Sequence, residues 1–167
     1  MKLEQQEAYL LLGTNMGDRA QNLNVATAFI EKEVGQVFGK SSVYETAAWG
    51  KTDQPGFLNQ AIGVKTSLLP LDMLKSLLAI EKKMGRVRLE RWGQRLIDID
   101  IIFYEDVIVL DDSELQLPHP EMHKRRFVLE PLSEIAGNFV HPIFKEKVSS
   151  ILSNLSDELT VEKLKTN

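Results

Sequence analysis

Two aspartates, Asp98 and Asp100, stand in an otherwise apolar stretch, LIDIDIIF, near the middle of the chain. Side chains alternate along a strand, so both carboxylates would share one face while Ile97, Ile99 and Ile101 share the other. Two carboxylates at this spacing lie about 6–7 Å apart along the strand and repel each other unless a cation lies between them. Because Mg²⁺ favours one or two carboxylates together with water and substrate phosphates, the pair indicates a magnesium–nucleotide site.

Positive charge is concentrated just before this stretch. Residues 82–95 contain six Lys and Arg residues and one acid, Glu90, although the whole chain has a net charge of −4. Carboxylates for a metal beside guanidinium groups for phosphate oxygens are the components of phosphoryl transfer. An isolated Asp-x-Asp triplet would be explained more simply as a solvent-facing edge strand, but the dense arginines beside it favour the catalytic interpretation.

The composition is that of one globular domain, residues 1–167, with 43% hydrophobic residues available for a core. The absence of cysteine excludes disulfides, thiolate metal sites and a cysteine nucleophile. The apolar run near the N-terminus is too short for a signal peptide or a membrane span, so we expect a cytoplasmic protein with no membrane partner. A nucleic-acid binder could use the arginines, but the net charge of −4 argues against nucleic acid as a partner.

Hydrophobic periodicity and turn residues predict strands interspersed with two amphipathic helices. Asp18 is a candidate N-cap of the first helix, and Pro70 opens the second. The order strand-helix-strand-strand-helix-strand is typical of an α+β, ferredoxin-like (split βαβ) fold, an antiparallel sheet flanked by helices. The predicted strands are 7–13, 36–45, 57–66, 96–104 and a short one at 107–110; the predicted helices are 18–34 and 70–84, then a proline-bearing loop or short helix at 115–127 and one or two short helices from 144.

The stretch RWGQRLIDIDIIFY, residues 91–104, resembles the signature of the 6-hydroxymethyl-7,8-dihydropterin pyrophosphokinase family of folate biosynthesis. Four other stretches resemble family segments in the same order: YLLLGTNMGD, VYETAAWGKTDQPGFLNQAI, IEKKMGRVR and LPHPEMHKRRFVLEPLSEIA. The resemblance covers about residues 8–145. It implies a magnesium-dependent diphosphokinase that transfers pyrophosphate from ATP to the hydroxymethyl group of the dihydropterin and leaves AMP.

The resemblance also implies roles for charged residues. Asp98 and Asp100 would bind two Mg²⁺ ions that bridge the triphosphate of ATP, and Arg86 and Arg95 would act in catalysis. This chemistry depends on positioning and charge neutralisation rather than on a strong nucleophile. The residues implied in ATP binding are Arg88, Arg91, His119 and Arg125.

A flat heterocycle with a polar edge requires stacking surfaces and a few fixed donors and acceptors. By resemblance, Phe57 and Phe127 would enclose the pterin ring and Asn59 would hydrogen-bond its edge; without the motif the two phenylalanines would be interpreted as core residues. Alternation along the strand places Phe57 and Asn59 on one face, and a buried amide requires partners. The implied pterin-binding set is completed by Thr46, Ala48, Trp49 and Trp92.

The chain departs from the family pattern in three places. The pair Leu89-Glu90 lacks a lysine that many members carry, Ala47 replaces a usual proline, and Glu114 stands where some members have arginine. An acid at that last position is not expected to bind phosphate. The alternatives are a magnesium-dependent phosphotransferase or nucleotide hydrolase with another acceptor, and a non-catalytic ferredoxin-like binding module. We expect a monomer whose partners are ATP and the dihydropterin.

Overall fold

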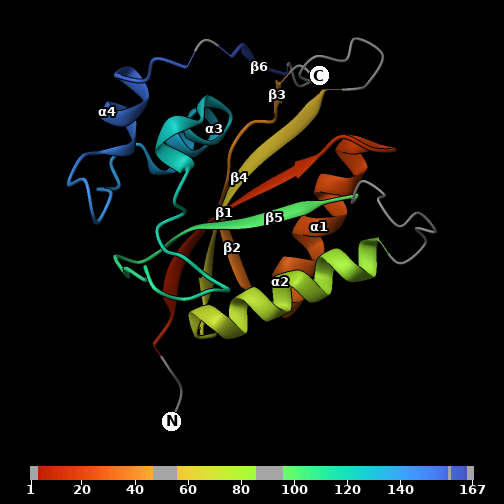
Figure 1. Ribbon diagram of the computed structural model, residues 1–167. Helices are drawn as coiled ribbons and strands as arrows, with labels where there is room; N and C mark the ends of the chain where they lie inside the picture. Colours follow the sequence, from red (N-terminus) through yellow and green to blue (C-terminus); the bar gives the residue numbers. More distant parts are fainter. Residues whose placement is uncertain (1–3, 47–55, 86–95, 158, 165–167) are drawn as a thin grey trace.

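The computed structural model describes residues 4–46, 56–85, 96–157 and 159–164, and these form a six-stranded sheet with helices on both faces (Figure 1). The elements in chain order are β1 (Gln6–Thr14), α1 (Arg19–Glu33), β2 (Gly35–Lys40), β3 (Tyr44–Thr46), β4 (Phe57–Thr66), α2 (Pro70–Met84), β5 (Asp98–Tyr104), the 3₁₀ helix η1 (Met122–Lys124), α3 (Arg126–Ala136), α4 (Val148–Ser153) and β6 (Val161–Lys163).

The sheet has the topology that the sequence predicts. Its strands run in the order β5-β1-β4, and β4 pairs with β2 along one half and with β3 along the other. β6 pairs with the remaining edge of β3, and every pairing is antiparallel. The two split βαβ units are β1-α1-β2 and β4-α2-β5, so the ferredoxin-like α+β prediction is confirmed.

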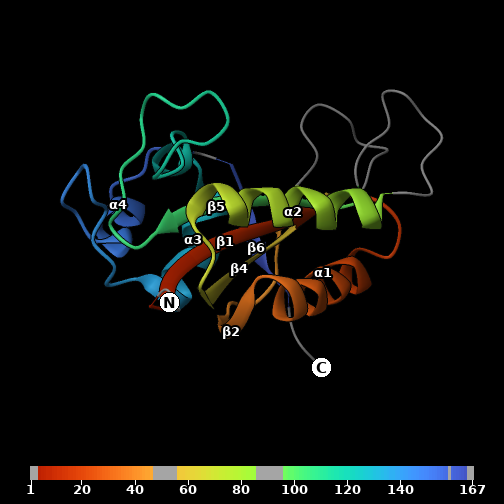
Figure 2. The same cartoon turned by 90° about the horizontal axis from the view of Figure 1, so that it is seen from below.

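The first face of the sheet packs against α1 and α2, which lie side by side across it (Figure 2). α1 begins where predicted, because the Asp18 carboxylate accepts a hydrogen bond of 3.1 Å from the Gln21 backbone N–H. Alternation sends one set of side chains from each central strand into this core. The buried residues of this core, from the strands and from the two helices, include Leu10, Leu12, Ile30, Leu58, Ile62, Leu77, Ile80, Ile97, Ile99 and Ile101.

The second face of the same sheet packs against α3 and α4 at one end only, among the elements that the structure describes. There Tyr9, Ala61 and Phe103 meet the apolar side chains of the two helices in a second core. The helical contribution to this core comes from Val128, Leu129, Leu132, Ala136, Val148 and Ile151. At the other end of this face lies a cavity rather than a helix.

The prediction of one strand at 36–45 was wrong, because residues 41–43 separate β2 from β3. At this break the Ser41 N–H still donates to the Ala61 carbonyl oxygen, but the Ala61 N–H donates a hydrogen bond of 2.9 Å to the Ser41 hydroxyl, so a side chain replaces one acceptor of the ladder. The short strand predicted at 107–110 was also wrong. Only an isolated bridge forms there, between Val109 and Leu117.

The region after residue 115 contains more regular structure than expected. A short helix does form, η1, but α3 then runs to Ala136 with Pro131 inside it. The apolar side of α3 packs on the sheet. The free energy gained by this burial exceeds the cost of the helix hydrogen bond that proline cannot donate. α4 is a short helix of the kind predicted after residue 144, whereas β6 was not predicted. None of the helices within the described residues is long and apolar enough to cross a membrane.

Candidate active site

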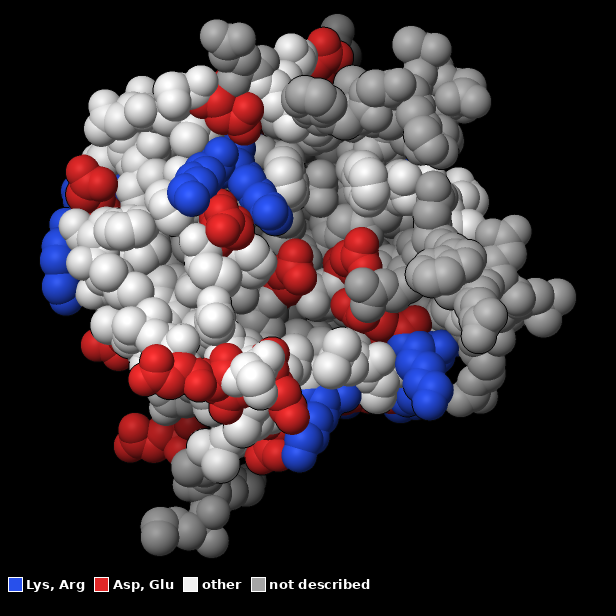
Figure 3. Space-filling view, viewed as in Figure 1, with Lys and Arg blue, Asp and Glu red and all other residues white. Residues whose placement is uncertain are grey.

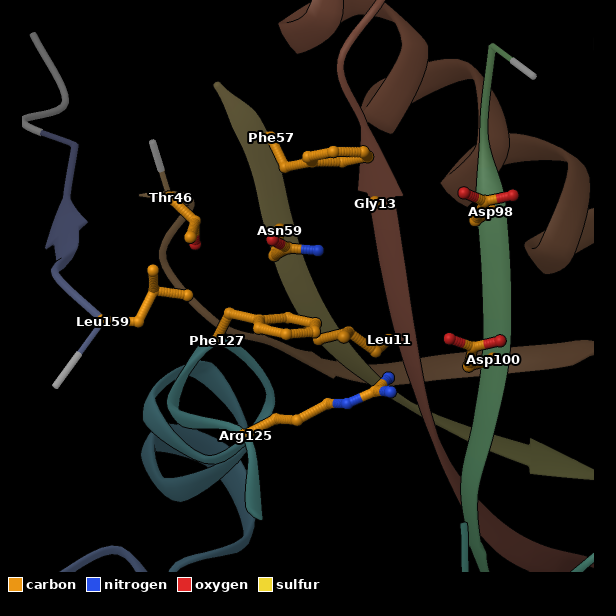
Figure 4. Close-up of a pocket in the computed structure, with 10 residues that line it drawn as sticks. All are labelled: Leu11, Gly13, Thr46, Phe57, Asn59, Asp98, Asp100, Arg125, Phe127 and Leu159. Atoms are coloured by element: carbon orange, nitrogen blue, oxygen red, sulfur yellow. The ribbon is translucent and has the colours of Figure 1, made fainter. Parts of the chain in front are cut away.

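A cavity of about 320 Å³ occupies the open end of the second sheet face (Figure 4). That volume suits a small organic ligand. In the space-filling view, acidic side chains lie in a hollow near the middle of this side of the molecule, with basic side chains beside it (Figure 3). The cavity is lined by Leu11, Gly13, Thr46, Phe57, Asn59, Asp98, Asp100, Arg125, Phe127 and Leu159.

The aspartate pair lies on β5 as predicted. Asp98 and Asp100 share the cavity face of the strand, and Ile97, Ile99 and Ile101 are at most 5% exposed on the opposite face. Within the described residues, no group of three or more His, Cys, Asp and Glu side chains could hold a metal ion. Two carboxylates on one face suit Mg²⁺, which favours one or two carboxylates together with water and substrate oxygens.

Glu81, at the end of α2, supports the strand between the two aspartates. The residue is 8% exposed, and its carboxylate accepts a hydrogen bond of 2.8 Å from the Ile99 backbone N–H. The Ile99 N–H points away from β1, so the carboxylate satisfies a donor on the outer edge of β5. The sequence could not distinguish this buried role from that of a solvated surface acid.

Asn59, Gly13 and Asp98 form one row across β4, β1 and β5, because Gly13 pairs with Asn59 on one side and with Asp98 on the other. Neighbouring strands lie about 4.8 Å apart, so the amide and the carboxylate are separated by about 10 Å of sheet. Glycine between them leaves room for the amide, since a Cβ at Gly13 would come within 2.7 Å of the Asn59 Nδ2 atom. The row is therefore a flat floor with a polar group at each end.

Two phenylalanine rings stand over this floor, Phe57 from β4 and Phe127 from α3, and the Asn59 amide lies between them (Figure 4). Phe57 is 38% exposed, so its ring borders the cavity instead of filling the core. The predicted grouping of Phe57, Asn59, Phe127 and Thr46 is found in the structure. The interpretation of the phenylalanines as simple core residues does not account for an open cavity between them.

Two buried polar atoms of the cavity have no hydrogen-bond partner within the described residues: Oδ1 of Asn59 and Oγ1 of Thr46. Both residues are at most 6% exposed. A buried polar atom without a partner costs roughly 1–3 kcal/mol, so such atoms in a cavity indicate a ligand that supplies the missing groups.

Arg125 and His119 lie near Asp100 on different sides of it. Arg125 reaches into the cavity from the start of α3, and its guanidinium carbon is 5.7 Å from the centre of the Phe127 ring. His119 lines a second groove, of about 280 Å³, which also contains Asp100 and Glu114. Its Nδ1 accepts a hydrogen bond of 3.1 Å from the Glu121 N–H. Burial lowers the pKa of His119, although the Asp100 charge opposes this.

Seven of the residues implied by the resemblance lie outside the described residues: Ala48, Trp49, Arg86, Arg88, Arg91, Trp92 and Arg95. Three cavity residues were missed, namely Leu11, Gly13 and Leu159. Alternation along β1 puts Leu11 and Gly13 on one face, but only the pairing of β1 with β4 and β5 brings that face to the cavity. No pattern in the sequence identifies Leu159, whose position depends on the path of the chain after α4.

Comparison with known proteins assigns this arrangement to a family. The family model described as "7,8-dihydro-6-hydroxymethylpterin-pyrophosphokinase (HPPK)" matches residues 9–137. The chain is 45% identical, over 149 residues, to a 2-amino-4-hydroxy-6-hydroxymethyldihydropteridine pyrophosphokinase of Methylorubrum extorquens; the alignment covers 89% of this chain and 92% of that protein. It is 42% identical over 138 residues to the protein of the same name from Aquifex aeolicus, covering 83% and 85% of the two chains.

Solved structures show the same fold in a larger protein. Wild-type Plasmodium falciparum HPPK-DHPS superposes with a TM-score of 0.75 over 90% of this chain, at 18% sequence identity. The present chain covers 43% of that longer chain. A folic acid synthesis protein of Dictyostelium discoideum is similarly long: the match is 42% identical over 147 residues but covers 22% of that protein.

Proposed function

The chain belongs to the 7,8-dihydro-6-hydroxymethylpterin-pyrophosphokinase family, and from this premise we propose that the cavity is where pyrophosphate passes from ATP to its acceptor. The activity is pyrophosphoryl transfer to hydroxymethyldihydropterin in folate biosynthesis. The proposal concerns the residues that carry it. It rests on one observation above all: a slot between Phe57 and Phe127 whose floor runs from Asn59 to Asp98.

The slot matches the shape and polarity of a dihydropterin. The two phenyl rings offer stacking surfaces for the bicyclic ring. Asn59 Oδ1 and Thr46 Oγ1 lack partners in the described part of the chain and would bond the polar edge of the pterin. The missing side chain at Gly13 leaves the floor open between Asn59 and Asp98, so the hydroxymethyl arm of a ring stacked between the phenylalanines can reach toward the aspartates.

Asp98 and Asp100 would hold Mg²⁺, and two ions are the proposed number. Bound there, magnesium would neutralise charge on the triphosphate. Arg125 and His119 flank Asp100 and would bind phosphate or ribose oxygens. The second groove, on the outer side of β5, would take the nucleoside of ATP, since Asp100 borders both spaces.

In the proposed reaction the pterin hydroxyl oxygen bonds to the β-phosphorus of ATP. The bond from that phosphorus to the oxygen that bridges to the α-phosphate breaks, AMP leaves with the electron pair, and the hydroxyl proton passes to solvent. The chain contributes position and charge: the slot fixes the acceptor, and the arginines stabilise the transferring group. Arg86 and Arg95 in catalysis, Arg88 and Arg91 at ATP, and Ala48, Trp49 and Trp92 at the pterin remain proposals from the resemblance.

Three further points also stay proposals. We propose that residues 1–167 act as one domain, that the protein is a monomer, and that it works in the cytoplasm. The second is checked by comparing the molar mass of the protein in solution with 18.9 kDa, the mass of one chain, and the first by whether urea unfolds the chain in one cooperative transition.

Product analysis tests the function. The protein is mixed with ATP, Mg²⁺ and 6-hydroxymethyl-7,8-dihydropterin, and the nucleotides and pterins are separated. We expect AMP and a pterin diphosphate in equal amounts, with no AMP when the pterin is omitted. ADP as the product would contradict pyrophosphoryl transfer and point to an ordinary kinase.

A further inference from the structure

One wall of the cavity comes from the C-terminal segment, here defined as Asp157 and residues 159–164, which lies beyond the matched residues 9–137. Leu159 of this segment lies on the side of the cavity away from the aspartates, near Thr46 and Phe127 (Figure 4). Its side chain is half-buried. The substrate slot is therefore completed by a residue far along the chain from the other lining residues.

The start of the C-terminal segment is attached to α3. One oxygen of the Asp157 carboxylate accepts a hydrogen bond of 3.1 Å from the Arg126 N–H, and the other accepts one of 2.9 Å from the Leu159 N–H. The Arg126 guanidinium donates back to the Asp157 carbonyl oxygen, at 3.3 Å from Nη2. These hydrogen bonds lower the pKa of Asp157. Because Phe127 follows Arg126, one carboxylate fixes both Leu159 and the helix start that carries the ring.

The other end of the C-terminal segment is attached to β3. β6 pairs antiparallel with β3, and Val161 is the register partner of Thr46. Beyond β6, the Leu164 N–H donates a hydrogen bond of 2.8 Å to the Val43 carbonyl oxygen, and the Leu164 side chain packs against the first core. Leu159 thus lies between two anchors, and each anchor also holds an element that lines the slot.

We propose that Leu159 is a specificity-determining residue of the pterin slot, held in place by the C-terminal segment. This inference rests on the proposed function and extends it. The leucine closes the side of the slot away from the aspartates, so a bound ring cannot slide away from Asp98 and Asp100. An apolar side chain is suited to contact the ring, while Asn59 and Thr46 bind its polar atoms. The nucleoside groove does not include Leu159, so its contribution concerns the pterin and not ATP.

The test compares Leu159→Ala with Leu155→Ala. Leu155 is a half-buried leucine after α4 that packs on the second core and does not line the slot, which makes it a matched control. We expect Leu159→Ala to raise the KM for the pterin about tenfold, the effect of losing most of one buried leucine contact. The KM for ATP should stay within twofold, and Leu155→Ala should leave both constants unchanged. Urea unfolding of both variants verifies that they are folded.

Two further variants make the inference falsifiable by other routes. Leu159→Phe narrows the slot and should also raise the KM for the pterin without changing the KM for ATP. Asp157→Ala removes the anchor and leaves the leucine in place, so it should raise the KM for the pterin about threefold, as expected for a loosened contact. An unchanged pterin KM in Leu159→Ala and Leu159→Phe, or equal changes for both substrates, would overturn the inference while the proposed function stands. If the unaltered protein formed no pterin diphosphate, the proposed function and the inference would both fail.

Discussion

The two ends of the second sheet face are built from the same three strands yet differ in what covers them. At one end Tyr9, Ala61 and Phe103 are buried under α3 and α4. At the other end, a few residues further along the strands, Gly13 and Asn59 face a cavity. Sheet geometry is common to both ends, so the difference comes from side chains: large apolar groups attract a helix, whereas glycine, an amide and carboxylates do not.

The covered end of the sheet face contributes mainly to the stability of the fold, and the cavity end contributes mainly to ligand binding. The covered end gains free energy from buried apolar area. The cavity end keeps two buried polar atoms without partners in the described residues, and these cost free energy until a ligand binds. It also places Asp98 and Asp100 on one face. Substitutions at the cavity end should therefore affect turnover with little loss of stability, and substitutions at the covered end should do the reverse.

The largest effect is expected at the cavity end. Asp100→Ala should lower kcat by about 10²–10³-fold or more, because it removes a group that holds and neutralises the reacting triphosphate. The same change relieves repulsion from Asp98, so the urea midpoint should not fall. Asp106→Ala, an exposed acid just after β5, is the control and should keep full activity. Near-normal turnover of Asp100→Ala would refute the metal-binding assignment.

At the covered end, Leu129→Ala should lower the free energy of unfolding by about 2–5 kcal/mol, since Leu129 is fully buried and its truncation leaves a cavity. Steady-state constants of the folded fraction at 15 °C should change less than threefold. Urea denaturation measures the first quantity. Leu110→Ala, at a side chain that is 61% exposed, serves as the comparison. A strong loss of activity with unchanged stability would contradict the separation of the two ends.

The cavity end was easier to predict from the sequence than the covered end, because polar residues in a strand stand out against an apolar background. The alternation of LIDIDIIF alone placed Asp98 and Asp100 on one face. By contrast, α3 contains Pro131, which local rules take as a break, and only its packing on the sheet explains why the helix continues. The packing of α3 on the sheet involves residues far apart in the chain, so a short stretch of sequence does not reveal it.

Leu159 and Glu81 show the same limit within the site itself. Leu159 reaches the cavity because Asp157 and β6 hold the segment around it, and neither contact has a local signal. Glu81 looks like one more charge at a helix end until β5 is placed beside it. Both positions depend on pairings between segments far apart in the chain, which periodicity cannot supply.

At the covered end, the stability of the protein should depend on pH through one buried histidine, His141. His141 is 2% exposed against Phe103 and Phe144, and burial, aided by the charge of His123, lowers its pKa from 6.5 to about 4. A lowered histidine pKa means that the unfolded chain binds the proton more tightly. The stability that depends on a neutral His141 is therefore fully present above pH 6.5. As the pH falls towards 4, the free energy of unfolding should fall by about 2–3 kcal/mol.

The measurement is the free energy of unfolding by urea between pH 7 and pH 4. His141→Asn keeps a side-chain acceptor for the Ile143 and Phe144 N–H groups but cannot titrate, so it isolates the histidine. The difference in free energy of unfolding between the unaltered protein and His141→Asn should shrink or reverse towards pH 4. Parallel curves for the two proteins would show that His141 does not carry the pH dependence.

A smaller effect is expected from the support of the aspartate strand. Glu81→Ala leaves the Ile99 N–H without this acceptor and should cost about 1–3 kcal/mol of stability, with a loss of turnover because β5 is less well fixed. Glu81→Gln retains a carbonyl oxygen as acceptor and should recover most of both properties. The comparison is made by urea unfolding and by kcat at saturating substrates. Equal behaviour of the two variants would show that the hydrogen bond to Ile99 is not what Glu81 contributes.

The smallest effect is expected at Gly13, where the absence of a side chain keeps the cavity end open. A Cβ at Gly13 would lie 2.7 Å from the Asn59 Nδ2 atom, and an amide at the end of a side chain can move aside. Gly13→Ala should therefore fold, displace Asn59 and raise the KM for the pterin about fivefold, the loss of part of one hydrogen bond. Gly39→Ala is the matched control, because its Cβ would meet only Ile135, at an ordinary 4.0 Å. If Gly13→Ala left the pterin KM unchanged while raising that for ATP, the floor between Asn59 and Asp98 would belong to the nucleotide and not to the pterin.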